Sequence, residues 1–202
     1  KKTPALDQLC SEVIVASTAL GRGIHPFILD EIARFIQTVN SYYTNAMEGN
    51  PSTLRDIEAA LNLKFGAQAS TRNFQLEHVA HIQVQNEMIH RLGHEPALRI
   101  CSPEFLCWLH EQFYLQLPTE MRYAKTKGGK TVPVVPGQLR DQGISVGTHD
   151  APEKKEAILS YLRQFEDFLS PEALNGPQKI IGMAASHHRL LWIHPFLDGN
   201  WP

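Results

Sequence analysis

The side chains that could do chemistry gather near the end of the chain, in the run His-Pro-Phe-Leu-Asp-Gly-Asn from His194 to Asn200. Proline disfavours helical backbone in the residue before it, so a preceding helix should end at His194 and leave the imidazole at the start of a loop. Asp198 supplies an acid able to hold a divalent cation, while Gly199 and Asn200 tolerate the tight backbone that aims amide groups at an anion. Together with an imidazole that titrates near neutrality, these groups suit phosphoryl-type chemistry.

The same spacing also fits a plain helix end, with a satisfied histidine followed by a turn. Two other histidine clusters are candidate metal ligands. His78 and His81 share a face of a predicted helix, but no third ligand lies near them in the sequence. His149 and Asp150 form a His-Asp pair such as a metal-dependent phosphohydrolase uses, but they lie in a segment rich in glycine and proline, which favours a solvated turn.

The identity of the residues is more specific than their spacing. The run from His194 to Asn200 resembles the signature of the Fic family, HPFxDGNGR followed two residues later by a second arginine. The preceding stretch, from Ala184 to Ile193, is also similar to the helix that leads into this signature. The resemblance implies an all-α Fic fold, a helical bundle with a short β-hairpin flap. It also implies a protein adenylyltransferase, which transfers AMP from ATP to a Ser, Thr or Tyr hydroxyl of a target protein.

The resemblance assigns a role to most residues of the run. His194 is the general base that takes the proton from the target hydroxyl. Asp198 binds the Mg²⁺ that bridges the nucleotide phosphates, and Gly199 and Asn200 help to form the nest that holds those phosphates. Phe196 packs into the core and holds the loop.

A second resemblance lies far upstream, where Thr44, Glu48 and Gly49 match the inhibitory pattern of the family: Ser or Thr, three residues, Glu, then Gly or Asn. A glutamate in the last turn of a helix faces the negative end of the helix dipole, which is unfavourable by about 0.3–1 kcal/mol. An exposed acid at a frayed helix end fits the position equally well. The resemblance implies that Glu48 pairs with the second arginine of the signature and so keeps the outer phosphate of ATP away.

A flap is the third feature that the resemblance implies, over about 131–148. Two short extended pieces, 131–135 and 144–146, interrupt a segment rich in glycine and proline and predict a small hairpin or paired arms. In the family such a flap docks the target by adding a strand through backbone hydrogen bonds. The docking residues implied here are Val134, Val135, Gly137, Gln138, Leu139, Ile144 and Val146. An irregular surface loop is the alternative.

Helices must position these features, and apolar spacing predicts most of them. Ile28, Ile32, Phe35, Ile36, Val39, Tyr43 and Met47 fall at helical spacing and trace one apolar stripe, which predicts an inhibitory helix over about 28–48. Further helices are predicted over 53–61 with its start at Ser52, and over 75–92, 103–117, 152–169 and 178–193. We therefore expect an N-terminal extension over 1–25 and a Fic-type domain over 26–202.

Composition fits a globular protein of the cytoplasm. Hydrophobic residues make up 43% of the 202 residues, and the net charge of −2 gives no reason to expect a nucleic-acid partner. The three cysteines are an odd number without metal-like spacing, so we expect free thiols in a reducing compartment. No run approaches the roughly 18 apolar residues of a membrane span, and the first residues lack the apolar core of a signal peptide.

The sequence departs from the family pattern at Trp201 and Pro202, where the signature has Gly-Arg. The glycine, both arginines and the helix that should follow are missing, so we expect impaired nucleotide binding. An alternative is a non-catalytic Fic remnant that binds a protein partner or forms a homodimer. A metal-dependent phosphohydrolase is a third alternative, using His149 and Asp150.

Overall fold

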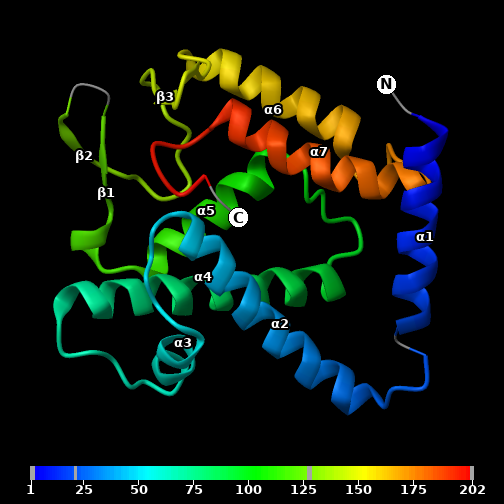
Figure 1. The fold of residues 1–202 in the computed structure, drawn as a ribbon. Helices are drawn as coiled ribbons and strands as arrows, with labels where there is room; N and C mark the ends of the chain where they lie inside the picture. Colours follow the sequence, from blue (N-terminus) through cyan, green and yellow to red (C-terminus); the bar gives the residue numbers. More distant parts are fainter. Residues whose placement is uncertain (1–2, 21, 127–128, 201–202) are drawn as a thin grey trace. The chain divides into compact units, whose positions relative to one another are not determined.

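A computed structural model describes residues 3–20, 22–126 and 129–200 of the chain. Within these residues it contains seven α-helices and two ladders of two short antiparallel strands (Figure 1). The prediction of a mainly helical fold with a small β element is therefore confirmed. The chain divides into two compact units, and each is described by itself.

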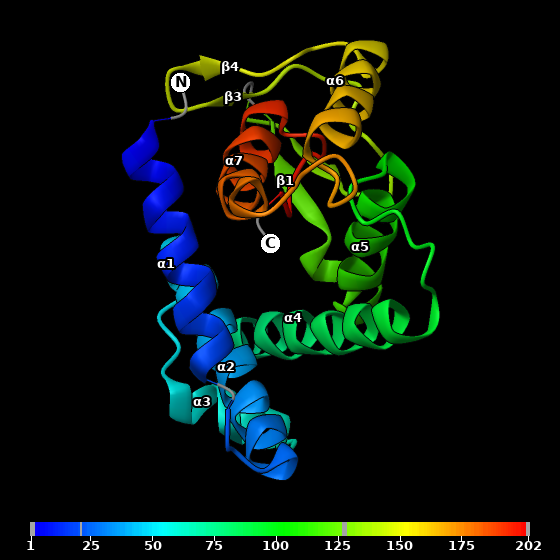
Figure 2. The ribbon, with the colours of Figure 1, turned by 90° about the vertical axis from the view of Figure 1, so that its right-hand side faces the viewer.

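The first unit comprises the residues up to Leu29, Arg99–Leu106 and Leu139–Asn200. Its helices are α1 (Pro4–Leu20), α6 (Lys155–Leu169) and α7 (Pro177–Ile193), and α7 packs against both of the others (Figure 2). On α6 the side chains of Ile158, Leu162 and Phe165 are buried, at the spacing of one helix face. Only Cys10 is buried on α1, a helix that the sequence reading treated as part of an extension.

The second unit comprises Asp30–Leu98 and Cys107–Gln138. The helices α2 (Pro26–Met47) and α5 (Pro103–Gln116) begin in the first unit and end in the second. The helices α3 (Leu54–Leu61) and α4 (Ala69–His94) lie wholly in the second. The helix α3 packs on α4 through buried Ile57 and Ala60.

Several helix boundaries differ from the prediction. The N-cap of α3 is Thr53 rather than Ser52, because Thr53 and Asp56 form a capping box in which each side chain accepts a hydrogen bond from the other residue's amide. The helix α4 begins at Ala69 and continues past Gly93, since one glycine costs a helix only about 1 kcal/mol.

The two extended pieces of the predicted flap do not pair with each other. The strand β2 (Thr131–Pro133) pairs with β1 (Tyr123–Lys125) in the second unit, and β3 (Ser145–Val146) pairs with β4 (His149–Asp150) in the first. Each piece thus takes the partner nearest in sequence, which needs the shorter loop to close. The prediction of one hairpin from 131–135 and 144–146 is wrong.

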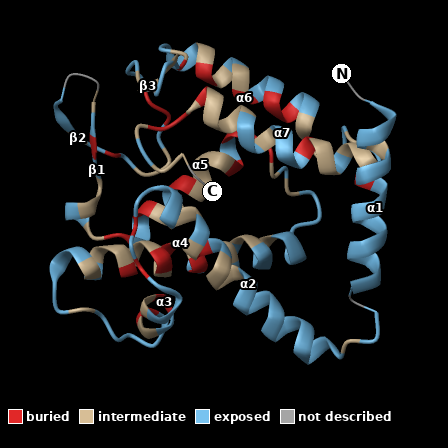
Figure 3. Ribbon diagram, in the orientation of Figure 1, coloured by how far each residue is buried: buried red, intermediate tan, exposed pale blue. Residues whose placement is uncertain are grey.

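The apolar stripe that predicted α2 is largely exposed (Figure 3). Phe35 is 62% exposed and Met47 is 65% exposed, whereas the one buried residue of the helix is Ser41. Apolar spacing shows that a helix is amphipathic without showing what covers its apolar face. Of the helices in the described residues, none combines the length and the apolar character needed to cross a bilayer.

Candidate active site

His194 stands at the end of α7, where the sequence predicted it. The helix ends at Ile193, and the amide of His194 donates the last helical hydrogen bond, 2.8 Å to the carbonyl of Leu190. His194 itself is left-handed, with φ 48° and ψ 65°, rather than extended as Pro195 would favour. A left-handed backbone costs a residue with a Cβ roughly 1–2 kcal/mol, so its surroundings must hold it there.

The loop after His194 is closed by the side chain of Asn200. Its Oδ1 accepts from the amide of Phe196 at 2.8 Å, and its Nδ2 donates to the carbonyl of Phe196 at 2.9 Å. Phe196 is buried, and Gly199 has φ +66°, a conformation that favours glycine. Asn200 thus organises the loop by side-chain bonds, in addition to the phosphate contact that the resemblance implies for it.

Arg140 also bonds this loop, although the sequence assigns it no role. Its side chain is only 2% exposed. Its Nε donates to the carbonyl of His194 at 2.6 Å and its Nη2 to the carbonyl of Ile193 at 3.2 Å. Its backbone amide donates to the carbonyl of Pro195 at 3.0 Å. In the sequence, Arg140 is a lone arginine beside an apolar leucine, in a segment rich in glycine and proline. No motif or residue spacing indicates that it has a function.

His149 also bonds the end of α7. Its Nε2 donates to the carbonyl of Trp192 at 3.0 Å, and its ring stacks on the indole of Trp192 with centroids 5.2 Å apart. The expected solvated turn is therefore wrong. His149 Nε2 is engaged by this carbonyl and Asp150 bonds Ser145. Among the described residues no third His, Cys, Asp or Glu joins the pair to hold a metal ion, so nothing supports a phosphohydrolase site here.

The imidazole of His194 is half-buried, and burial is the largest cause of a pKa lowered from the usual 6.5. The cation of Arg140 lowers this pKa further, and His149 acts in the same direction. The carbonyl of Leu191 and the carboxylate of Asp198 oppose the shift without reversing it. The ring is therefore mainly neutral at pH 7 and able to accept a proton.

Asp198 lies exposed in the loop, four residues after His194. In the part of the chain that the structure describes, no three His, Cys, Asp or Glu side chains are grouped to hold a metal ion, and this includes His78 and His81. Mg²⁺ is commonly bound by one or two carboxylates together with substrate phosphates and water. A single accessible carboxylate therefore fits a Mg²⁺ that arrives with a nucleotide.

The predicted inhibitory residues lie in the second unit, at the end of α2. Thr44 is half-buried on the helix, and Glu48 is exposed at the helix cap. Gly49 has φ +88°; its amide donates to Ala46, and the next amide donates to Asn45. These two bonds form a Schellman motif, which requires a left-handed residue at Gly49.

Polar contacts fasten this turn to α4. The buried side chain of Asn50 donates to the carbonyl of Phe74 at 3.2 Å and to the carboxylate of Glu77 at 3.1 Å. One turn earlier, the Oγ of buried Ser41 lies 2.9 Å from Nδ1 of buried His78. The position of Glu48 is therefore set by α2 and by its contacts with α4.

The predicted flap residues have different surroundings. The side chains of Val134 and Leu139 are buried, that of Ile144 is half-buried, and those of Val135 and Gln138 are exposed. Gly137 has φ +74°, and its amide donates to Nδ1 of His110 at 2.9 Å, within the second unit. Val146 contributes backbone to β3, and its side chain lies outside the description.

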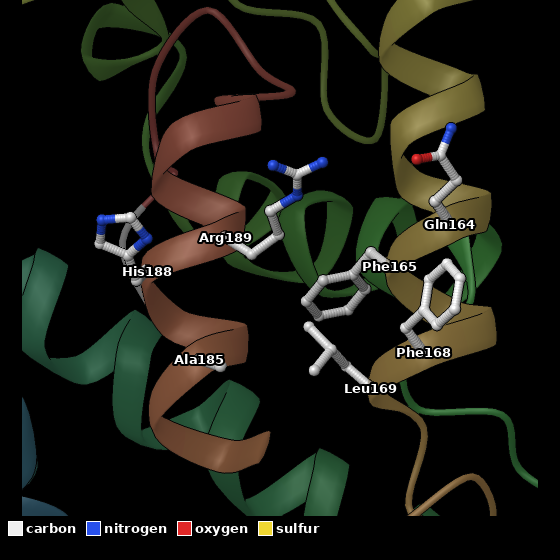
Figure 4. A pocket seen from close by; sticks show the side chains of 7 residues that line it. All are labelled: Gln164, Phe165, Phe168, Leu169, Ala185, His188 and Arg189. Atoms are coloured by element: carbon white, nitrogen blue, oxygen red, sulfur yellow. The ribbon is translucent and has the colours of Figure 1, made fainter. Parts of the chain in front are cut away.

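A groove of about 530 Å³ lies between α6 and α7 (Figure 4). It is lined by Gln164, Phe165, Phe168, Leu169, Ala185, His188 and Arg189. None of the predicted site residues lines it, so it is separate from the His194 loop. Trp201 and Pro202, where the sequence leaves the family pattern, lie outside the described residues.

Comparison with known proteins identifies the family. The model of the Fic/DOC family matches residues 100–201, which include the His194 loop. A protein adenylyltransferase Fic of Drosophila mojavensis is 26% identical over 160 residues, which cover 79% of this chain and 28% of that protein. The protein adenylyltransferase fic-1 of Caenorhabditis elegans is 27% identical over 176 residues, which cover 87% of this chain and 32% of that protein.

A solved structure shares the fold. The Fic family protein of Desulfovibrio desulfuricans G20 superposes with a TM-score of 0.65 at 20% identity, over 99% of this chain and 55% of that one. The chain thus spans about a third or less of the length of the two curated relatives. The family match covers half of the chain and contains the loop described above, and the chain belongs to the Fic/DOC family.

Proposed function

We propose that this chain carries the catalytic residues of a protein adenylyltransferase, which transfers AMP from ATP to a Ser, Thr or Tyr hydroxyl of a target protein. One observation carries the proposal: a histidine kept neutral by burial caps α7 and is followed by an exposed aspartate in a closed loop. The names of the matched relatives support the same activity. Three free cysteines suit a reducing compartment such as the cytoplasm.

His194 accepts the proton of the target hydroxyl as the oxygen attacks the α-phosphorus of ATP. The new bond joins the hydroxyl oxygen to the α-phosphorus, the bond from the α-phosphorus to the bridging oxygen breaks, and pyrophosphate leaves. Asp198 would hold Mg²⁺, which when bound neutralises charge on the phosphates. The backbone at Gly199 and Asn200 would face the phosphates as an anion nest.

Two further roles belong to the proposal. Glu48 restrains the reaction by pairing with the second arginine of the family signature. The flap docks the target by backbone hydrogen bonds, for which the exposed Val135 and Gln138 are the accessible side of the segment.

The test compares label transfer from two forms of ATP. Trp201 and Pro202 are replaced by Gly-Arg, and the chain is extended with the helix that follows the signature in the family. This extended chain is incubated with a lysate and Mg²⁺. The same lysate without the chain gives the background transfer by its own enzymes. Added transfer to protein from ATP labelled at the α-phosphate, with no added transfer from ATP labelled at the γ-phosphate, is the expected result. Added transfer from the γ-labelled form would indicate a kinase, and added transfer from neither form would contradict the proposal.

A second candidate function has its own observation. The exposed apolar stripe on α2 favours a protein-binding module, with a second copy of the chain as the partner. This candidate requires no nucleotide.

A further inference from the structure

Four consecutive carbonyls at the end of α7 accept hydrogen bonds from one segment of the same unit. The carbonyls of Trp192, Ile193, His194 and Pro195 are bonded, in that order, by His149 Nε2, Arg140 Nη2, Arg140 Nε and the backbone amide of Arg140. The last carbonyls of a helix normally lack partners, so this segment acts as its cap.

Arg140 cannot serve as a phosphate ligand in this arrangement. Its Nε and Nη2 are engaged by α7, and its Nη1 donates to the carbonyl of Gln142 at 2.7 Å. With the side chain 2% exposed, no face is left for an anion. Arg140 therefore does not replace the arginine that the family signature places after Asn200.

The bonds of Arg140 fall on both sides of the strained residue. The carbonyls of Ile193 and His194 flank the left-handed φ and ψ of His194, and the carbonyl of Pro195 lies one residue further on. Because the imidazole leaves the backbone at this residue, the direction of the side chain depends on these dihedral angles. The side chain of Asn200 bonds the loop at Phe196, two residues after His194.

We propose that Arg140 is the positioning residue of the His194 loop, holding the left-handed backbone that directs the imidazole. Its importance for the reaction rests on the proposed function, whereas the clamp itself can be tested without activity. A lysine keeps the cation but lacks the planar fork, so it cannot bond several carbonyls with fixed geometry.

The experiment measures amide hydrogen exchange by mass spectrometry on the 202-residue chain and three variants. Arg140→Gln removes the cation and the fork, and Arg140→Lys removes only the fork. Arg99→Gln is the matched control, because Arg99 lies in the same unit, is 72% exposed and forms an ion pair with Glu166. The imidazole Cε1–H signal of His194 is followed by NMR in each protein.

In both Arg140 variants we expect exchange over residues 190–200 to rise at least about tenfold, while exchange over α6 stays as in the parent chain. The His194 signal should shift in both, and neither change should occur in Arg99→Gln. Unchanged exchange over 190–200 would overturn the proposal. An equal rise over α6 would also overturn it, because Arg140 would then be an ordinary core residue. If Arg140→Gln fails to fold, Arg140→Lys decides the matter.

Failure of the clamp and failure of the function remain distinguishable. Absence of AMP transfer in the extended chain would contradict the proposed function and leave the exchange result standing. Conversely, unchanged exchange in a chain that transfers AMP would remove only the role of Arg140.

Discussion

At the scale of single residues, the proposed chemistry depends on how His194 is kept neutral. Burial and the nearby cation of Arg140 act in the same direction, and Asp198 only partly offsets them. The histidine is thus prepared to take a proton rather than to give one, which is what an attacking hydroxyl requires.

Replacing the base should separate catalysis from binding. In the extended chain, we expect His194→Ala to lower AMP transfer at least about 100-fold, because a positioned general base contributes about that much or more. Binding of ATP by calorimetry should change little, since the imidazole acts on the hydroxyl and not on the phosphates. His188→Ala is the control, an exposed histidine on the same helix. Transfer that persists in His194→Ala would point to another base.

The titration of His194 can be followed directly. Since its pKa is lowered from 6.5, the ring of the folded chain should titrate with a midpoint below that value. An NMR titration of the ring protons checks this, with the His194→Ala spectrum used to assign the signal. A midpoint at or above 6.5 would mean that the ring is more solvated than its half-buried position implies.

Among residues, the sequence marks His194 and Asp198 because their chemistry and their family pattern are local. It does not mark Arg140, whose partners lie 53 and 54 residues away. Nor does it reveal that His149 packs on Trp192. The sequence places His149 in a segment rich in glycine and proline, which predicts a turn, and only the tertiary structure brings this residue to α7. Contacts over such distances come from the tertiary structure, which local patterns do not encode.

At the scale of elements, the end of α2 is the feature on which the proposed inhibition by Glu48 depends. The Schellman turn and the bonds of Asn50 hold Glu48 in a defined place on the second unit. We expect Glu48→Gly to raise AMP transfer several-fold in the extended chain, because the arginine that it restrains becomes available. Glu58→Ala, an exposed acid on the neighbouring α3, is the control.

The same substitution in the 202-residue chain has a different expected outcome. This chain has no arginine after Asn200, so Glu48→Gly should leave ATP binding by calorimetry unchanged. If the substitution activates neither protein, Glu48 is an ordinary surface acid. A change of ATP binding in the shorter chain would show that Glu48 acts on something else.

Helix positions were mostly predictable, because spacing and caps are local signals. Strand partners were not, since each two- or three-residue strand carries too little pattern to select its neighbour. The helix α1 was missed because its apolar residues were read as part of an extension, and most of them are in fact exposed.

At the scale of the whole molecule, two histidines of α4 make stability depend on pH. Burial lowers the pKa of His78 to about 4, helped by the neighbouring His81, and burial lowers that of His81 to about 4. Both rings are neutral in the folded chain, whereas in the unfolded chain they take up protons below about pH 6.5. The free energy of unfolding therefore has its full value above about pH 6.5 and decreases as pH falls toward 4.

We expect the free energy of unfolding to fall between pH 6.5 and 4 by up to about 1.4 kcal/mol per pH unit for each histidine. Urea titrations at several pH values measure this slope. His81→Gln should lower this slope by about 1.4 kcal/mol per pH unit, the contribution of one bound proton. His90→Gln changes an exposed histidine of the same helix and should leave the slope as it is. A flat profile would mean that neither ring is desolvated.

The exposed stripe on α2 predicts self-association of the chain. If a second copy covers it, sedimentation should show a dimer whose population falls when Phe35, 62% exposed, is changed to Lys. Phe168→Lys, at a 72% exposed aromatic residue on α6, is the control. A monomer at all concentrations would leave the stripe for a different partner and remove the second candidate function.

The bonds between Arg140 and the end of α7 also set an order of events during synthesis. The arginine leaves the ribosome 54 residues before His194, and its guanidinium has no carbonyl of α7 to bond until that helix has emerged. Closing a loop of this length costs entropy that grows only with the logarithm of its length. We therefore expect the histidine to acquire its left-handed backbone late, when the first unit closes on itself. A chain nicked between the two segments and separated from Arg140 would keep every residue of the signature and yet lack the bonds that hold the backbone of His194.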